Sequence, residues 1–231
     1  MEDPDYGVAW EPITPKGANP GKISHHKPAV FGQSVVVFGG IKDYDNNEEA
    51  FEYDAVKNTW YELKQTGDVP APRDDHSLNL IDDERFMIFG GFVAGSRVNE
   101  AYVCRKNGNT LEWKRIGENS QQLPSIRASH SAVIHNNKCY IFGGQDDDNN
   151  KLNDLWELDL ATEAWTEVEL APGSYPPACR SGHSANLFRG KMYVFGGILE
   201  LTKELNEMLC YDFEARSFSL IGNASNIDEA F

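Results

Sequence analysis

The sequence predicts an all-β fold, a β-propeller built from repeated four-stranded blades. An apolar strand ending in Phe-Gly-Gly occurs four times in the 231 residues, and the first glycines of the copies are 51, 53 and 53 residues apart. An aromatic residue follows each glycine pair after about twenty residues, a layout typical of propeller blades. The expected structural positions are Gly39, Gly40, Gly90, Gly91, Gly143, Gly144, Gly196 and Gly197 for the glycines, and Trp60, Trp113, Trp165 and Phe218 for aromatics that pack the blades.

The third copy shows how one repeat divides into strands. Apolar and polar residues alternate over 129–134 and again over 152–159, which predicts two strands with one buried face each. Asn136-Asn137 is a turn signal before a second strand over 138–142, and Trp165 opens a fourth strand. The same division predicts four complete blades over about 22–63, 73–116, 127–168 and 180–221.

Composition limits the class of protein. The chain carries 36 acidic and 21 basic residues, a net charge of −15, which disfavours binding to nucleic-acid phosphates. No apolar run approaches the ~18 residues of a membrane helix, and the first residues lack the pattern of a signal peptide. The four cysteines are far apart and form no Cys-x-x-Cys pair, so we expect reduced thiols and a cytoplasmic or nuclear location.

The motifs together resemble the kelch-repeat family. Each copy follows the order Arg-x-x-His, apolar-Phe-Gly-Gly, a strand ending in Tyr-Asp or Leu-Asp, and an aromatic, with local departures in copies one and two. The resemblance covers residues 22–221. It implies a propeller of four-stranded antiparallel blades, and the Arg-x-x-His-Ser variant is similar to long-repeat kelch proteins that act as trafficking effectors, polarity factors and substrate receptors of ubiquitin ligases.

The N-terminus predicts one strand without a blade. Residues 10–13 repeat the pattern of 60–63, so we expect a lone outer strand over 8–13. In propellers that resemble this one, such a strand completes the last blade, but here the fourth blade already has an outer strand over 218–221. We therefore expect the N-terminal part of a longer ring of about six or seven blades; the alternative is a closed four-bladed ring with a surplus strand.

Three arginines are candidates for ligand contact. Arg73, Arg127 and Arg180 recur at spacings of 54 and 53 residues, and in a propeller they would surround one mouth of the central pore. Guanidinium groups there could hold an acidic side chain or a free C-terminus of a partner, as arginines of this motif do in similar kelch receptors. The alternative is that they pair with loop acids and orient the linkers. Ile23 interrupts the series in the first copy.

The loops after the glycine pairs are the other candidate binding surface, because variable loops on a rigid frame usually carry specificity. Candidate contact residues there are Phe92, Arg97, Asp146, Asp147 and Leu199. The acidic loops 43–49 and 146–150 could also dock a basic partner. They lack the pattern of a calcium-binding EF-hand loop.

No metal or cofactor is expected. His26, His76, His130 and His183 occupy equivalent positions in successive blades, too far apart to share an ion at ~2 Å, so we expect structural hydrogen bonds from them.

The sequence favours an interaction module that binds a protein or peptide, with no catalytic residues. The alternatives are a structural component of a cytoskeletal or ciliary assembly and, less in keeping with the motifs, an enzyme similar to galactose oxidase or to the kelch specifier proteins. Phosphate-loop, nucleophile-elbow and His-Glu-x-x-His motifs do not occur. We therefore expect no small-molecule substrate.

Overall fold

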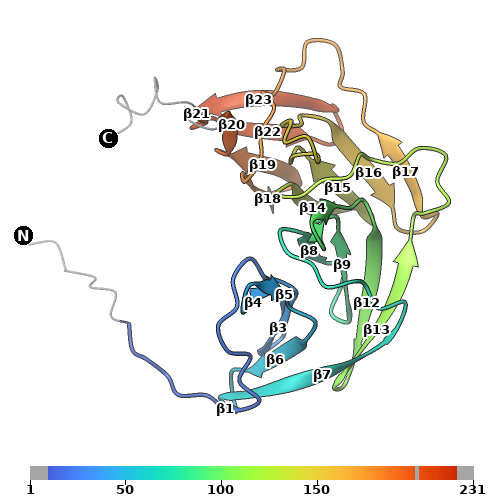
Figure 1. The fold of residues 1–231 in the computed structure, drawn as a ribbon. Helices are drawn as coiled ribbons and strands as arrows, with labels where there is room; N and C mark the ends of the chain where they lie inside the picture. Colours follow the sequence, from blue (N-terminus) through green and yellow to red (C-terminus); the bar gives the residue numbers. More distant parts are fainter. Residues whose placement is uncertain (1–9, 201–202, 223–231) are drawn as a thin grey trace, which may run out of the picture.

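A computed structural model describes residues 10–200 and 203–222, and in this part of the chain every regular element is a β-strand. Four antiparallel four-stranded blades follow one another along an arc, with blades 1 and 4 at its two ends (Figure 1). The expected all-β propeller architecture is confirmed. The described residues include no helix long and apolar enough to span a membrane.

Each blade places its strands in sequence order, from an inner strand to an outer one, as the hairpin connections dictate. Blade 1 contains β2 (Lys27–Phe31), β3 (Ser34–Phe38), β6 (Ala50–Asp54) and β7 (Thr59–Gly67); blade 2 contains β8 (Ser77–Leu80), β9 (Arg85–Phe89), β12 (Ala101–Asn107) and β13 (Thr110–Ile116); blade 3 contains β14 (Ser131–His135), β15 (Lys138–Phe142), β16 (Leu155–Asp159) and β17 (Ala164–Glu167); blade 4 contains β18 (Ser184–Phe188), β19 (Lys191–Phe195), β22 (Met208–Asp212) and β23 (Ser217–Gly222).

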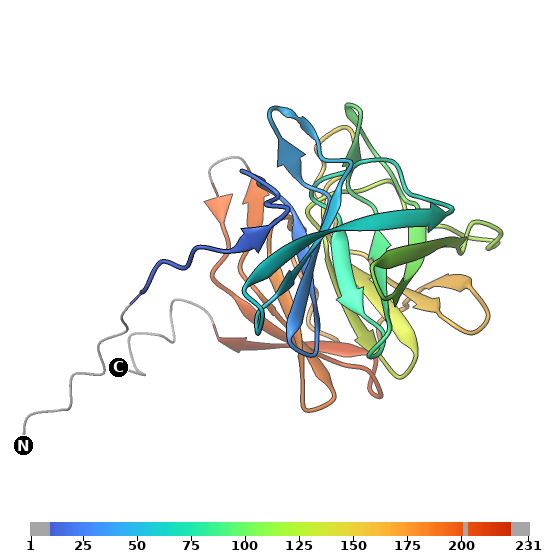
Figure 2. The same ribbon diagram turned by 90° about the horizontal axis from the view of Figure 1, so that it is seen from below.

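Short hairpins follow the glycine pairs of three blades. They are β4 (Ile41–Lys42) with β5 (Asp45–Asn46), β10 (Phe92–Val93) with β11 (Ser96–Arg97), and β20 (Ile198–Glu200) with β21 (Lys203–Glu204). In blade 3 a single bridge between Gln145 and Lys151 takes their place. The long β7 continues past blade 1 and pairs in parallel with β13, which joins the outer edges of blades 1 and 2 (Figure 2).

The apolar core lies between blades rather than within one. Each blade turns a forward face toward the next blade and a rear face toward the preceding one, because side chains alternate across a strand. In β9, Phe86 and Ile88 pack against blade 1, whereas Met87 and Phe89 pack against blade 3. Three such interfaces hold the arc together, one for each pair of consecutive blades.

The expectation of an N-terminal strand over 8–13 is corrected for residues 10–13, which form no strand. Residues 8 and 9 lie outside the described part of the chain, and residues 10–13 pair with no strand. Trp10 is 92% exposed, so it has no packing partner to fix an extended segment. A two-residue strand, β1 (Lys16–Gly17), instead pairs in parallel with Thr59 and Trp60 of β7.

Candidate functional site

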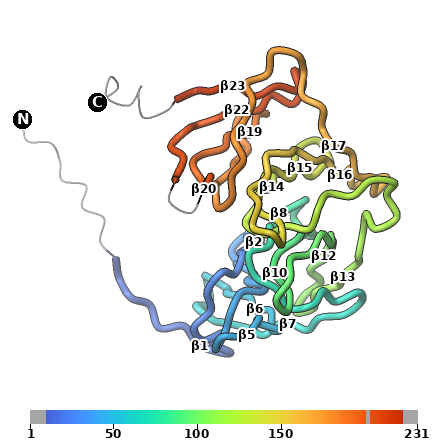
Figure 3. Tube along the Cα trace, turned by 45° about the horizontal axis from the view of Figure 1, so that its top comes forward, coloured from blue at the N-terminus to red at the C-terminus, as the bar shows by residue number. Residues whose placement is uncertain are grey.

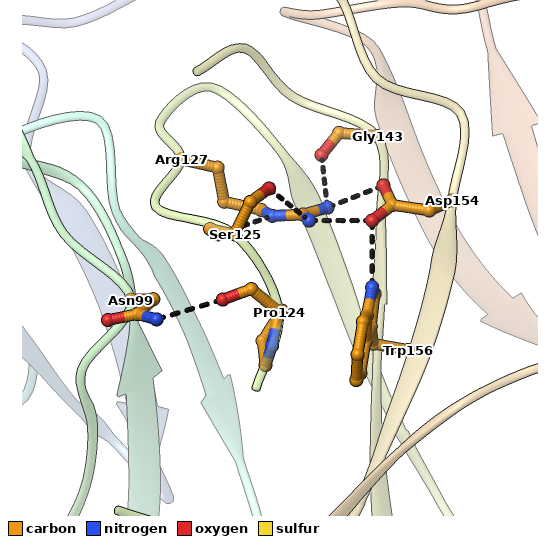
Figure 4. Close-up of polar contacts among 7 residues, drawn as sticks. All are labelled: Asn99, Pro124, Ser125, Arg127, Gly143, Asp154 and Trp156. Atoms are coloured by element: carbon orange, nitrogen blue, oxygen red, sulfur yellow. Dashed lines mark hydrogen bonds and ion pairs between the residues drawn. The ribbon is translucent and has the colours of Figure 1, made fainter. Parts of the chain in front are cut away.

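The Arg127 side chain lies inside blade 3 and is fully buried (Figure 4). Its Nη1 and Nη2 donate to the two carboxylate oxygens of Asp154 at 2.8 and 2.7 Å, and Nη1 also donates to the Gly143 carbonyl at 3.1 Å. The Nε donates to the Ser125 carbonyl at 3.1 Å. This two-fold Arg–carboxylate contact fixes the linker and first strand against the start of the third strand.

Arg73 and Arg180 repeat this arrangement. Both are fully buried, and they donate to Glu100 and Glu207 at 2.8 Å. The expectation that the three arginines contact a ligand is therefore corrected: guanidinium groups with no exposed surface brace their own blades. The expectation of an acidic partner rested on these groups and loses its basis.

The two residues before the third strand make two contacts: the acid binds the buried arginine, and the asparagine binds the linker to the next blade. In blade 3, Asp154 holds the arginine while Asn153 Nδ2 donates to the carbonyl of Pro177 in the following linker, at 3.0 Å. In blade 2, Asn99 holds Pro124 in the same way, at 2.8 Å (Figure 4). Blade 1 has Ile23 in place of the arginine, and its Glu49 pairs with Lys42 instead.

The repeated histidines connect neighbouring blades. His130 Nε2 lies 2.9 Å from Ser77 Oγ of the preceding blade, and His183 Nε2 lies 2.8 Å from Ser131 Oγ. His76 has no hydrogen-bond partner on either ring nitrogen, because Lys27 stands where the other blades have serine. Burial, reinforced by the nearby arginines, lowers the pKa of His76 and of His183 to about 3 and also lowers that of His130.

The second glycine of each pair completes the same interface. The Gly144 N–H donates to the Arg180 carbonyl of the next blade at 2.9 Å, as Gly40 does to Arg73 and Gly91 to Arg127. The first glycines lie equally close: a Cβ on Gly143, whose φ is +61°, would stand 2.8 Å from the Arg180 carbonyl oxygen. The Phe-Gly-Gly signal therefore marks where the next blade docks.

A cavity opens on the side of the arc where the hairpins that follow the glycine pairs lie. It has a volume of about 570 Å³, and blades 1, 2 and 3 all contribute to its wall. We call it the mouth cavity. It is lined by the hairpin residues Ile41, Tyr44, Asp45, Asn46, Phe92, Ala94, Gly95, Arg97 and Gln145 and by His25, Asp74, Asp75 and Ala128 from the Arg-x-x-His turns. Figure 3 labels β5 in the blade 1 hairpin and β10 in the blade 2 hairpin, and residues of both strands line the cavity.

Hydrogen bonds between blades hold the wall of the cavity in place. Asn46 Nδ2 donates to Asp74 Oδ2 at 2.6 Å, and Ser129 Oγ donates to Asp75 Oδ2 at 3.3 Å. Arg97 Nη2 donates to Asn149 Oδ1 at 2.9 Å. A cavity walled by bonded loops of three blades presents a largely preformed surface to a partner.

The loop residues predicted to contact a partner fall into three groups: some line the mouth cavity, one supports its wall, and others lie apart from it. Phe92 and Arg97 line the mouth cavity. Asp147 accepts from the backbone N–H of Arg97 at 2.8 Å, so it supports the wall, whereas Asp146 bonds within its own loop. Leu199 lies on β20 of blade 4, apart from the cavity lining.

The mouth cavity holds three carboxylates that make no ion pair with another described residue: Asp45, Asp74 and Asp75. Asp74 is only 6% exposed, and burial together with the charge of Asp75 raises its pKa despite the Asn46 hydrogen bond and the nearby His25. A cationic group entering the cavity would therefore relieve an unfavourable charge arrangement.

The turn residues of the cavity were missed from the sequence, although a signal exists. Within Arg-x-x-His, the residue before the histidine has a left-handed backbone, with φ of 56° at His25, 50° at Asp75 and 55° at Ser129. The Ser129 N–H donates to the Asp75 carbonyl at 3.0 Å, so these turns are linked from blade to blade. The turn residues that line the cavity, His25, Asp74, Asp75 and Ala128, all occupy the two variable positions of this motif.

Tyr44 lies in the acidic loop 43–49, which the sequence marks as a candidate docking surface, but its ring was not singled out. Tyr44 is fully exposed at the tip of the β4–β5 hairpin and has a φ of 74°. An exposed aromatic ring held in a sparsely populated backbone conformation is typical of a contact residue rather than a packing one.

Within the described part of the chain, no group of three or more His, Cys, Asp or Glu side chains is placed to hold a metal ion.

Comparison with protein families agrees with this architecture. The family model of the KLHDC2/KLHL20/DRC7 Kelch-repeats domain matches residues 7–118 and, in a second overlapping match, residues 95–227. The chain belongs to the kelch-repeat family.

The curated relatives that match this chain are longer proteins. The leucine-zipper-like transcriptional regulator 1 homolog of Drosophila melanogaster is 26% identical in an alignment of 238 positions that covers 96% of this chain and 24% of that protein. Host cell factor 2 of Homo sapiens is 31% identical over 225 residues, covering 88% of this chain and 28% of that protein. A probable serine/threonine-protein kinase of Dictyostelium discoideum is 32% identical over 177 residues, 75% of this chain and 13% of that protein. The chain thus spans less than a third of each relative.

Proposed function

We propose that this kelch chain is a protein-interaction module and that its mouth cavity binds a segment of a partner protein that presents a lysine or arginine side chain. One observation carries the proposal: Asp45, Asp74 and Asp75 share a preformed cavity of about 570 Å³ and make no ion pair among the described residues. The kelch family assignment supports the general role, since similar kelch proteins act through their partners.

The cavity supplies both parts of such a contact. A basic side chain in the cavity would meet two adjacent carboxylates in partly desolvated surroundings, where charge pairs contribute more than at an open surface. Tyr44 and Phe92 would flank its aliphatic stem, and aromatic rings also attract cations over their faces. The net charge of −15 would speed the approach of a basic partner.

A peptide array followed by calorimetry tests the proposal. We expect the selected peptides to carry Lys or Arg, and Asp75→Asn to weaken their binding about tenfold or more, since a buried charge contact behaves as a hot spot. Asp83→Asn is the matched control: it removes the same charge from the exposed β8–β9 turn and should leave the affinity unchanged. Selection of acidic peptides, or an equal loss in both variants, would contradict the proposal.

A second pair of variants separates shape from charge. Tyr44→Ala should weaken the same peptides without changing stability, because the ring is fully exposed. Val56→Ala removes an exposed apolar side chain from the turn between β6 and β7, at the opposite end of β6 from the β4–β5 hairpin, and should have no effect. If neither variant changes the affinity, the peptide does not use the blade 1 hairpin.

A further inference from the structure

In blades 1, 2 and 4 the linker that enters the blade forms backbone hydrogen bonds with the outermost strand. The carbonyl of the outer aromatic residue accepts from a linker N–H in each case, at 3.0, 2.9 and 2.9 Å: Ala18 to Trp60, Asp68 to Trp113 and Tyr175 to Phe218. The linker thereby covers an edge whose N–H and C=O groups could otherwise pair with another chain.

Blade 3 lacks this backbone pairing. Its linker turns at Gly117, whose carbonyl accepts from the Ser120 N–H at 3.3 Å. The Ser120 hydroxyl takes the place of the backbone at β17: it accepts from the Trp165 N–H at 2.9 Å and donates to the Trp165 carbonyl at 3.3 Å. Backbone groups of an edge strand point outward at every second residue, so the Glu167 N–H also points away from β16, and no described residue accepts from it. We call the edge formed by these four residues the blade 3 edge site.

Trp165 lines two cavities at the blade 3 edge site. One, of about 460 Å³, is walled by the linker and β17, and the other, of about 240 Å³, by the linker and blade 2. Trp165 is 4% exposed, yet its indole N–H donates to no described residue, whereas Trp113 Nε1 in blade 2 donates to Gln65 Oε1 at 3.0 Å. Because a buried indole N–H normally has a partner, this one marks a place for an acceptor from a ligand.

The charged residues that line the two cavities are already paired. Glu163 contacts Lys114 at 2.5 Å. Arg115 contacts Glu100 at 3.4 Å and Glu118 at 3.2 Å. The blade 3 edge site therefore differs from the mouth cavity, since it offers a ligand backbone and indole groups rather than unpaired carboxylates.

We infer that the blade 3 edge site binds an extended segment of a partner protein, as a strand parallel to β17, with the sequence Gln-x-Gly followed by Asp or Asn. Residues 65–68 of this chain, Gln-Thr-Gly-Asp, specify this occupant because they cover the equivalent edge of blade 2. There Gln65 accepts from the Trp113 indole N–H. Asp68 donates its N–H to the Trp113 carbonyl, and its side chain accepts from the Arg115 N–H at 3.1 Å.

Blade 3 offers the same groups to such a segment. The glutamine accepts from the Trp165 indole N–H, and the residue after the glycine donates to the Trp165 carbonyl while its side chain accepts from the Glu167 N–H. Glycine is required between them, because a Cβ on Gly67 would stand 2.3 Å from the Trp113 carbonyl oxygen. The incoming strand displaces one side-chain contact, that of Ser120.

The occupant comes from another protein. In this sequence Gln-x-Gly occurs only at residues 65–67, and these residues are already paired with β13 in blade 2. A second copy of the chain therefore has no free segment of this kind to offer. Extended segments that add a strand to an exposed sheet edge are a recurring mode of peptide recognition.

A capped synthetic peptide with the sequence of residues 63–70 tests the inference. It carries the change Lys64→Ala, so that no basic side chain can enter the mouth cavity. We expect titration into the isotope-labelled 231-residue chain to move the Trp165 indole N–H resonance downfield, as a new hydrogen bond requires. Trp165→Phe, which places in blade 3 the residue that blade 4 has as Phe218, identifies that resonance. Peptides in which the glutamine is leucine or the glycine is valine should bind about tenfold more weakly or worse.

Two variants at one position test the pairing from the other side. Glu167→Pro removes an N–H that no described residue accepts, which an edge strand tolerates, and should weaken the first peptide about tenfold. Glu167→Ala keeps the N–H and should leave the affinity within about twofold. Equal melting temperatures of the two variants establish that both are folded; the peptide comparison in the unmodified chain decides the matter if the proline variant is not.

Three results would overturn the inference: a Trp165 indole resonance that does not move, equal affinity for the glutamine and leucine peptides, or equal affinity of the two folded Glu167 variants. A peptide that moves only the resonances of Phe92 and Arg97 would overturn it as well, and would leave the mouth cavity as the binding surface.

Discussion

Blades 3 and 4 share the residues of the repeat motif, and they differ in what covers them. Phe142 and Phe195 both end a second strand in front of a glycine pair, yet one is fully buried and the other is 48% exposed. Arg127 and Arg180 are equally buried in the two blades. The buried Arg–carboxylate contact therefore forms within a single blade, whereas the apolar core forms only between two consecutive blades.

This difference divides the repeat motif into two functions. The arginine and the acid before the third strand hold a blade's own loops, and the phenylalanine, glycines, serine and histidine join it to a neighbour. Stability of such an array is a sum of blade terms and nearest-neighbour terms. Matched substitutions in blades 3 and 4 can measure the two terms separately.

The largest effect is expected for Arg127→Ala. It leaves Asp154 without its cation and the Gly143 carbonyl without a donor, and breaking a buried ion pair from one side costs about 3–5 kcal/mol. Arg105→Ala removes an exposed pair with Glu84 and should cost less than about 1 kcal/mol. Urea unfolding measures both; equal losses would show that Arg127 is not a brace.

Gly143→Val and Gly196→Val should separate backbone strain from docking. Both glycines have left-handed φ values, 61° and 68°, so both variants carry a strain cost of about 1–3 kcal/mol. A side chain at Gly143 also meets Arg180 and His183, whereas at Gly196 the nearest atom is 3.3 Å away. We expect Gly143→Val to cost about 1–3 kcal/mol more, measured as a difference in unfolding free energy. An equal cost would mean that the glycines are needed only for their backbone angles.

The buried histidines should make stability depend on pH. Their pKa values are lowered, to about 3 for His76 and His183, from an ordinary value of 6.5. The folded chain thus binds fewer protons than the unfolded chain between these values, so its stability is complete above pH 6.5 and falls as the pH drops toward 3. Each histidine contributes about 1.4 kcal/mol per pH unit in that window.

Denaturant unfolding at pH 7 and pH 5 measures this slope while most carboxylates stay ionised. His183→Gln should reduce the slope by the contribution of one histidine. If the wild-type chain has the same unfolding free energy at both pH values, the histidines are protonated in the folded state and the assignment of neutral rings is wrong.

We expect the smallest effect from removing the serine hydroxyl that hydrogen-bonds to the histidine of the next blade. Ser131→Ala leaves His183 Nε2 buried without a partner and should cost about 1–3 kcal/mol. Ser184→Ala, at the equivalent position in blade 4, which no following described blade covers, should change the unfolding free energy by less than about 0.5 kcal/mol. A comparable loss from Ser184→Ala would mean that its face is already covered.

The fold was predictable because the repeat is explicit: four Phe-Gly-Gly strands at a nearly constant spacing dictate four similar blades. The role of Arg73, Arg127 and Arg180 was not, because a recurring arginine at a pore mouth fits a ligand contact and an internal brace equally well. The side-chain direction decides between them, and it depends on the acid before the third strand, 27 residues further on.

The mouth cavity was predictable only in part. Phe92 and Arg97 were found because the loop after a glycine pair varies between copies. Asp74 and Asp75 were overlooked because they sit inside the conserved-looking motif, where sequence spacing does not reveal that the turn points its variable residues into the cavity.

Residue-resolved hydrogen exchange of the glycine amides in the 231-residue chain tests whether each Phe-Gly-Gly is a docking site for the next blade. We expect strong protection of Gly40, Gly91 and Gly144, whose N–H groups donate to the next blade at 2.9 Å, and rapid exchange of Gly197. Protection of Gly197 equal to that of Gly144 would contradict it.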